Sequence, residues 1–366
     1  MKKPSRGALL TIISVIIIYA AVFVAEQTIN PNSMLFTVLK KGATYALVAA
    51  SMNLLNGFTG LFSLGQAGFM LVGAYAYGIL TIPAESRGIV YQYFNGGIVK
   101  FSLPVIPALI AAGLVAALFA YLIGLPVLKL KSDYLAIATL GFAEIIRAIL
   151  QWNKLGPLTN GSNMLRLFPS FTDFNIKNAS GEVTLYLSTF IPMLITGVCV
   201  ALMLLLINST YGRAFIAIRD DEIAAEAMGI NLASRKKQAF CISSFFAGIG
   251  GAMLAMYAGS VQAKSFTSSM TYEILLIVVI GGIGSIAGSC ISSFLFVACS
   301  EWWLRFLDRT QYIGDWQVPL LGSGFRMVVF SVVIMVVVLF FRRGIMGDKE
   351  LWEVFDRKRG KERKRS

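Results

Sequence analysis

Histidine is absent from the sequence, which removes the side chain that most often serves as a general base, a proton carrier or a metal ligand. The chain has four cysteines among 366 residues, none in C-x-x-C spacing, so neither a disulfide framework nor a metal site is predicted. A G-x-x-x-x-G-K-[ST] phosphate loop is also missing, which argues against ATP hydrolysis within this chain. No converging acids or nucleophile beside a base stand out, so the sequence does not predict an enzyme.

Charge is scarce as well. Only 14% of the residues are charged, against about a quarter in soluble domains, while 57% are hydrophobic and the mean hydropathy is +0.72. A water-soluble body of this size could not bury so much apolar surface, so we predict an all-α polytopic integral membrane protein. Stretches close to the length of a membrane-crossing helix occur at residues 8–25, 42–58, 61–82, 102–125, 133–152, 183–207, 238–258, 273–299 and 325–341.

The topology depends on the stretch 273–299, which glycines interrupt. Basic residues gather on the cytoplasmic side of membrane proteins, and here ten of the 32 Lys and Arg lie in 342–365 and five more in 211–237. Both regions and the basic N-terminus fall on one side only if 273–299 is split. We therefore expect about ten transmembrane helices, with the N- and C-termini in the cytoplasm.

The same pattern predicts the domain organisation. Residues 1–345 are expected to form the transmembrane domain, and residues 346–366 a basic cytoplasmic tail. The net charge of +13 then reflects orientation in the lipid bilayer. Each basic residue beside anionic headgroups contributes about 1 kcal/mol, so we expect the tail to contact lipid and predict no nucleic acid partner.

The cytoplasmic loop 208–237 is the most informative segment. Asp220 or Asp221 can cap a short helix that Gly229 ends, but such a helix is too short to be stable alone in water. Ile223 and Ile230 would lie on one apolar face close to solvent. The helix must therefore pack either on a separate partner or on its own membrane domain.

The loop resembles the coupling loop of ABC-importer permeases, and its order R-A-x-x-A-I-R-x-x-E-I-A-A-E-A-x-G-I-N is similar to the LivM-type permease family of branched-chain amino acid importers. Residues 57–75, 134–147 and 281–288 agree with that family too, and the resemblance runs from about residue 40 to 345. In the general importer pattern E-A-A-x-x-x-G, Ile223 takes the Glu position and Glu222 is displaced by one. The resemblance implies a loop that couples to an ATPase through Arg213, Arg219, Asp221, Glu222, Ile223, Ala224, Ala225, Glu226 and Gly229.

The resemblance also implies an assembly in a prokaryotic inner or plasma membrane. It implies a second permease subunit, with a heterodimer expected, two ATP-binding subunits inside and an extracytoplasmic solute-binding protein outside. ATP and Mg would be bound by the ATPase subunits, and no cofactor by this chain. The implied function is translocation of leucine, isoleucine and valine by a transmembrane permease domain.

Glycines that interrupt apolar segments in both halves of a transporter are the best sequence sign of a substrate path. Here one break lies in 57–68 and a second in 281–288. Close helix packing through small residues, or a tight turn between spans, is the alternative explanation of the same glycines. The path hypothesis names Ser63, Gly65, Gln66, Gly68, Phe69, Gly282 and Gly284.

Glu144 and Arg147 stand three residues apart on the expected helix 133–152, with Thr139 on the preceding turns. Charges within a membrane are costly, face the protein interior and often mark a transport path. We include Glu144, Arg147 and Thr139 in the path hypothesis. An ion pair that holds the helix bundle together is the alternative interpretation.

Other functions stay open at this stage. A permease of the same family could carry urea or another small solute. An ion-coupled secondary amino-acid transporter is less favoured, because Glu144 stands nearly alone and no histidine relay exists.

Overall fold

The structure is a computed structural model that describes residues 6–305, except 32, 131 and 179–181, together with short pieces between 312 and 351. These pieces are 312–313, 316–317, 328–329, 331–332, 335, 344–347 and 349–351. The predicted crossing at 325–341 lies mostly outside the described residues, and so does most of the predicted tail.

The described chain is mostly helical, as predicted. The helices are α1 (Arg6–Thr28), α2 (Met34–Asn56), α3 (Gln66–Thr81), α4 (Arg87–Val90), α5 (Val105–Val127), α6 (Ser132–Leu150), α7 (Gly156–Thr159), α8 (Phe190–Ile207), α9 (Thr210–Asp220), α10 (Glu222–Ala227), α11 (Leu232–Ala258), α12 (Ser268–Gly281) and α13 (Ile286–Ala298), which continues as a π-helical turn (Cys299–Trp303). The strands are β1 (Leu165–Arg166), β2 (Ile176–Lys177), β3 (Val183–Leu185), β4 (Ser260–Val261), β5 (Tyr312–Ile313) and β6 (Trp316–Gln317). They form three antiparallel pairs, β1–β4, β2–β3 and β5–β6.

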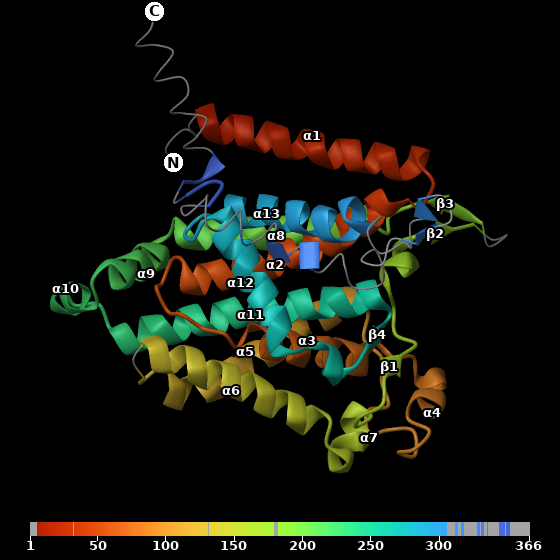
Figure 1. Ribbon diagram of the computed structural model, residues 1–366. Coiled ribbons are helices and arrows are strands. Elements are labelled where there is room, and N and C mark those ends of the chain that lie inside the picture. Colours follow the sequence, from red (N-terminus) through yellow and green to blue (C-terminus); the bar gives the residue numbers. More distant parts are fainter. Residues whose placement is uncertain are drawn as a thin grey trace, which may run out of the picture.

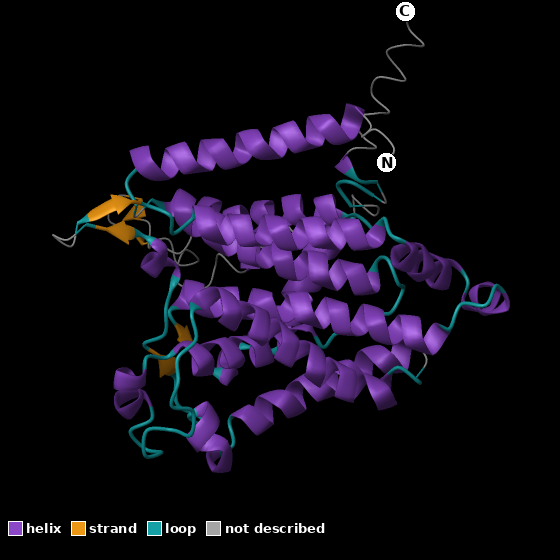
Figure 2. Ribbon diagram, turned by 180° about the vertical axis from the view of Figure 1, so that it is seen from behind, coloured by secondary structure: helices purple, strands orange, loops and turns teal. Residues whose placement is uncertain are grey.

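The long helices form one bundle, with α11 packed against α2, α3 and α5 (Figure 1). α13 lies on α2 and α12, whereas α6 lies on α3. α1 runs along the outside of the bundle and contacts α8 (Figure 2). Leucine and isoleucine side chains stay exposed along α1, α5 and α8, as expected for surfaces that face lipid.

The bundle has two different ends (Figure 1). The α10 end holds α9 and α10, and the loop end holds α4, α7 and strands β1–β4. The amides of Ile345 and Met346 donate to the carbonyls of Ile280 and Gly281, so residues 344–347 lie beside the last turn of α12. The start of α1 and these residues both lie at the α10 end (Figure 1).

Glycines hold α3 and α11 at the centre of the bundle in close contact. A Cβ atom on Gly73 would lie 2.1 Å from the carbonyl oxygen of Gly248, and one on Gly251 would lie 1.9 Å from that of Met70. Such approach of two backbones is available only to the smallest residues. This contact fixes the position of α3, whose first turn lies inside the bundle.

The described helices overlap the predicted crossings, but several bounds differ, and α2 begins at Met34, eight residues before the predicted start at 42. α8 begins only at Phe190, because residues 183–185 form a strand, and α11 begins earlier, at Leu232. The stretch 61–82 is helical only from Gln66. By length and composition, five described helices can cross a membrane, or up to seven if each of two bent pairs counts as one crossing. The stretch 273–299 is split at its glycines into α12 and α13, as expected.

Candidate functional site

The α10 knob, residues Asp221–Ile230, projects from the bundle beyond α9 (Figures 1 and 2). Asp221 is extended, with φ −162°, and separates the end of α9 from the start of α10. Its carboxylate accepts hydrogen bonds from the amides of Ile223 (2.8 Å) and Ala224 (3.0 Å). Asp221 rather than Asp220 is therefore the capping residue.

The other end of α10 is closed by Gly229. Its φ of +83° is readily available to glycine, and no atom lies within 4 Å of a Cβ built there, so conformation rather than space requires glycine. The amide of Gly229 donates to the Glu226 carbonyl and that of Ile230 to the Ala225 carbonyl. This pair of bonds is a Schellman motif, which satisfies the last carbonyls of so short a helix.

The knob presents apolar side chains to solvent. Ile223 and Met228 are each 83% exposed, whereas Ala225 is buried on the side that faces the rest of the loop. Ala224 and Glu226 are exposed as well. Within the described chain the knob does not lie on its own membrane domain, which leaves Ile223 and Met228 free to meet another protein.

α9 joins the knob to the bundle. Phe215 and Ile218 of α9 are buried, while Arg213 is exposed. Lys236 at the start of α11 donates to the Glu222 carboxylate at 2.6 Å and so ties the knob to the next helix. The knob is thus held at both ends.

Arg219 connects α9 to the interior of the bundle. One of its guanidinium nitrogens donates to the Gly57 carbonyl at 3.1 Å, where α2 ends. Gly60, with φ +71°, lies so close that a Cβ there would be 3.0 Å from Cγ of Arg219. A displacement of α9 would therefore reach the Gly57–Gly60 turn directly.

Beyond that turn the chain re-enters the bundle without helical structure. Residues 61–65 have no regular secondary structure, and side chains accept from several of their backbone amides. The amide of Ser63 donates to Asn56 Oδ1 (3.1 Å), and the amide of Leu64 donates to Thr139 Oγ1 (3.0 Å). Non-helical backbone at membrane depth is tolerated only where it is buried in protein or lines a cavity.

The predicted path residues around the start of α3 are buried. Gln66 donates to Ser51 Oγ at 2.6 Å, and the Phe69 ring packs edge-to-face on Phe240 of α11. A Cβ on Gly65 would meet Thr139, and one on Gly68 would lie 2.8 Å from Cα of Ala143. Both glycines thus bring α3 close to α6, as the packing interpretation expects, and the path role of this group stays a prediction.

The first turns of α3 and α12 contact each other inside the bundle. α12 begins beside the first turn of α3, where the amide of Ala67 donates to Thr271 Oγ1 at 3.2 Å. Ser268 donates to Glu144 Oε1 at 2.6 Å, and Arg147 pairs with the other carboxylate oxygen. Glu144 therefore joins α6 to the start of α12. The structure brings Thr139, Glu144 and Arg147 together with the starts of α3 and α12.

Gly282 and Gly284 lie elsewhere, in the turn between α12 and α13. Asn53 of α2 holds this turn: its amide nitrogen donates to the carbonyls of Gly282 and Ser285, and its oxygen accepts from the Gly284 amide. A Cβ on Gly282 would lie 2.4 Å from the Gly347 carbonyl oxygen. These glycines thus sit in a packed turn towards the α10 end, apart from the α3–α12 contact, and their path role is untested.

Sequence reasoning missed the residues that complete the contact between α3 and α12. Ser51, Asn56, Ser268 and Thr271 supply hydrogen bonds around the starts of α3 and α12, yet none of them stands out from the other polar residues in or beside the same apolar stretch. The available signal was weak. Isolated hydroxyls cannot be ranked by pattern alone, because those in membrane helices usually bond their own backbone.

Comparison with known proteins identifies a family and several relatives of the chain. The sequence model of the family described as "Branched-chain amino acid transport system / permease component" matches residues 34–341. The high-affinity branched-chain amino acid transport system permease protein LivM of Escherichia coli K12 is 34% identical over 278 residues, which cover 70% of this chain and 60% of the relative. The chain thus spans about 60% of the length of this curated relative.

Two more distant relatives are matched over most of their length. The probable branched-chain amino acid transport permease protein LivM of Methanocaldococcus jannaschii is 24% identical, over 84% of this chain and 91% of the relative. The E. coli K12 permease protein LivH is 22% identical, over 90% of this chain and all of the relative. No solved structure matches. The protein belongs to the family of branched-chain amino acid transport permease components.

Proposed function

We propose that this chain is a membrane-spanning subunit of an ATP-driven importer that carries leucine, isoleucine and valine inward. An external binding protein delivers the amino acid, and ATP and Mg are bound in separate ATPase subunits. This chain binds no cofactor. The proposal is supported by the family and by the relatives' names, which describe branched-chain amino acid transport.

The observation that best supports the proposal is the exposed apolar surface of the α10 knob. Ile223 and Met228 expose apolar surface on a helix that is capped at both ends and held outside the bundle. Neighbouring exposed apolar side chains of this kind are typical of a surface that contacts another protein. A cleft in an ATPase subunit is the partner that the loop's resemblance implies.

The contacts of Arg219 suggest how a movement of the ATPase subunits reaches the proposed substrate path. ATPase closure would displace the knob and α9, and Arg219 would pass that displacement to the Gly57–Gly60 turn. The non-helical residues 61–65 follow this turn and lead to α3 and its contact with α12.

The topology follows from the same assignment. We propose ten crossings with the α10 end in the cytoplasm, counting 61–82 and 259–281 as interrupted crossings and 325–341 as the last. The basic residues of 211–237 and 342–365 support this orientation. A second permease subunit completes the membrane part, and the similarity to both LivM and LivH supports a heterodimer.

Reconstitution tests this function. The chain is co-purified with its second permease and both ATPases, placed in proteoliposomes with ATP, and supplied with leucine-loaded binding protein. We expect leucine uptake that needs ATP and persists when a protonophore collapses the ion gradient. Gly229→Val should abolish uptake without loss of membrane insertion, because a branched residue is strained at φ +83°. Gly229→Asn is the matched control, since asparagine tolerates this conformation.

The other functions give different results in this assay. An ion-coupled transporter would lose uptake with the protonophore and keep it without ATPases. A urea permease would accumulate urea and not leucine. Uptake by Gly229→Val at the wild-type rate would contradict the coupling role of the knob.

A further inference from the structure

The chain that follows the last predicted crossing packs against the turn between α12 and α13. We call its described residues 344–347 and 349–350 the C-terminal clamp. A Cβ atom on Gly344 would lie 2.6 Å from Cα of Gly282, and one on Gly282 would lie 2.4 Å from the Gly347 carbonyl oxygen. The backbones of the clamp and of the turn are therefore in direct contact.

The clamp bridges the end of α12 and the start of α13. On the α12 side, the amides of Ile345 and Met346 donate to the carbonyls of the last two residues of α12 at 2.8 and 3.1 Å. On the α13 side, the Ser285 hydroxyl donates to the Lys349 carbonyl at 2.9 Å. Sequence patterns gave no sign of this bridge, because Ser285 and Lys349 are 64 residues apart.

Glu350 makes the strongest of these contacts. Its side chain is buried, and its two carboxylate oxygens accept from the amides of Ile286 (2.7 Å) and Ala287 (3.2 Å). The first amides of a helix have no partner within the helix, and the helix dipole favours a negative charge beside them. Hydrogen bonds to an ionised group are about twice as strong as those between neutral groups. Glu350 therefore fixes the first turn of α13 to the clamp.

The same turn lies on the route that begins at Arg219. The guanidinium of Arg219 donates to the Gly57 carbonyl, and a Cβ atom on Gly57 would lie 2.6 Å from the amide nitrogen of Gly284. That amide donates to Asn53 Oδ1 at 2.9 Å. A displacement of α9 would thus reach the α12–α13 turn through the end of α2.

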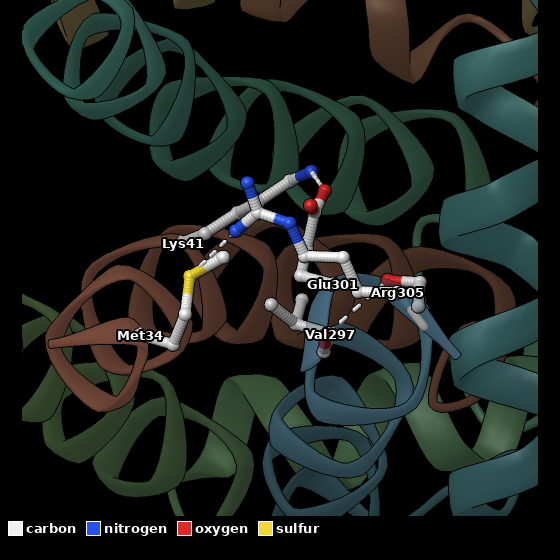
Figure 3. A network of polar contacts seen from close by, with 6 residues as sticks. Met34, Lys41, Val297, Glu301 and Arg305 are labelled. Atoms are coloured by element: carbon white, nitrogen blue, oxygen red, sulfur yellow. Dashed lines mark hydrogen bonds and ion pairs between the residues drawn. The ribbon is translucent and has the colours of Figure 1, made fainter. Parts of the chain in front are cut away.

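The opposite end of α13 is tied to α2. Lys41 of α2 forms an ion pair with Glu301 in the π-helical turn that follows α13, and Figure 3 shows the two side chains pointing toward one another. Beside this pair, the Arg305 guanidinium donates to Met34 Sδ at 3.0 Å (Figure 3). Because α13 is held at both ends, a displacement of the turn is expected to move α12 rather than α13.

We propose that Glu350 is a positioning residue for coupling, which locks the clamp across the α12–α13 turn so that the turn passes the movement of α9 to α12. This inference rests on the proposed function and adds a residue outside both the knob and the predicted path group. α12 carries the movement to Ser268 and Thr271, which bond to α6 and α3 at the other end of the helix. Without the Glu350 carboxylate the turn yields locally, and ATP is hydrolysed with less transport.

The first test measures coupling in the reconstituted complex. Leucine uptake and ATP hydrolysis are measured together, and their ratio gives the leucine transported per ATP. Glu350→Ala removes both acceptors, and we expect this ratio to fall more than twofold. Lys349→Ala keeps the carbonyl that Ser285 bonds and should leave the ratio unchanged. A cap that serves only the fold would lower uptake and hydrolysis together, so a ratio for Glu350→Ala within twofold of wild type overturns the proposal.

Glu26 offers a matched control, because it caps another helix in the same way. Its buried carboxylate accepts from the amides of Thr189 (2.6 Å) and Phe190 (2.9 Å) at the start of α8. α8 begins after β3 at the loop end, away from the α12–α13 turn (Figure 1). Glu26→Ala should therefore lower uptake and hydrolysis in parallel. A ratio that falls as far in Glu26→Ala as in Glu350→Ala overturns the positioning role.

Hydrogen exchange with a second variant decides the outcome if Glu350→Ala fails to assemble. Glu350→Gln keeps the size of the side chain but not its charge, and its amide nitrogen cannot accept a hydrogen bond. We expect the amides of residues 286–287 to exchange more than threefold faster in Glu350→Gln than in wild type, because local opening sets their exchange. Exchange in α11 should be unchanged, and leucine transported per ATP should fall more than twofold. A smaller acceleration, or a ratio within twofold of wild type, overturns the proposal.

The outcomes distinguish this inference from the proposed function. Wild-type leucine uptake with an unchanged ratio in the Glu350 variants overturns the role of the clamp and leaves the importer function intact. If the wild-type complex takes up no leucine, the importer function itself is wrong, and Glu350 has no transport to couple.

Discussion

The α10 knob and the contact between α3 and α12 use their side chains in opposite ways. The knob directs Ile223 and Met228 outward, and its own fold does not use them. At the α3–α12 contact, the polar groups of Gln66, Thr139 and Thr271 all bond to neighbouring segments. A function for the knob can therefore be inferred from its unused surface, whereas a path role at the contact cannot be separated from packing by geometry alone.

A glycine of the knob and a glycine at the contact between α3 and α11 differ in a similar way. Gly229 serves a backbone conformation in open space, while Gly73 serves a close approach of two helices. Substitutions can thus be arranged by what they are expected to remove: the fold, the partner contact, the path, or a single surface interaction.

The largest effect is expected at Gly73. Gly73→Leu places a Cβ atom 2.1 Å from the Gly248 carbonyl oxygen, so α3 and α11 must separate. We expect the chain to be degraded or to elute as aggregate in detergent gel filtration. Gly141→Leu is the matched control, because no atom lies within 4 Å of its Cβ. A monodisperse Gly73→Leu complex with wild-type transport would show that this contact does not hold the fold.

The next largest effect is expected on the surface of the knob. Changing Ile223 and Met228 together to Asp should leave the fold intact and lower affinity for the ATPase subunits at least tenfold, because burying each apolar side chain contributes about 1.5–3 kcal/mol. Pull-down of the ATPases and leucine uptake are the measurements. Ile89→Asp, an exposed isoleucine at the loop end, should leave both unchanged. Wild-type ATPase affinity in the double variant would place the partner surface elsewhere.

A smaller effect is expected at the start of α3. Gln66→Leu removes the donor to Ser51 and should change the rate of leucine uptake without weakening ATPase association. Thr139→Val leaves the Leu64 amide without its acceptor and should lower stability by about 1–3 kcal/mol. Uptake and thermal unfolding are measured on both. If Gln66→Leu loses stability and keeps its transport rate per folded complex, its role is packing alone.

Sequence patterns predicted the parts of the fold that depend on local composition. The apolar stretches and the cap of α10 follow from residues close in the chain, whereas the split of 273–299 at its glycines was predicted from the distribution of basic residues along the whole chain. The start of α3 at Gln66 was missed because residues 61–65 are as apolar as the helix that follows. The amides of Ser63 and Leu64 donate to Asn56 of α2, seven residues away, and to Thr139 of α6, 75 residues away, so only part of this arrangement is local in sequence.

The candidate site likewise has a part that sequence patterns identified and a part that they could not identify. The residues of the knob were identified because their spacing is local. The partner of Glu144 on α12 depends on which helices lie side by side. Charge counting along one helix cannot show that α12 brings Ser268 to Glu144.

The smallest effect is expected at Glu222, whose carboxylate pairs with Lys236 at 2.6 Å. The Glu222 side chain is 52% exposed, and exposed ion pairs contribute about 0–1 kcal/mol, so Glu222→Gln should barely change thermal unfolding. Leucine uptake should stay within twofold of wild type if Lys236 is the only group that uses this carboxylate. A tenfold fall in uptake with unchanged stability would mean that the ATPase binds Glu222 directly. The displaced glutamate would then take the role that the general importer pattern gives to the position of Ile223.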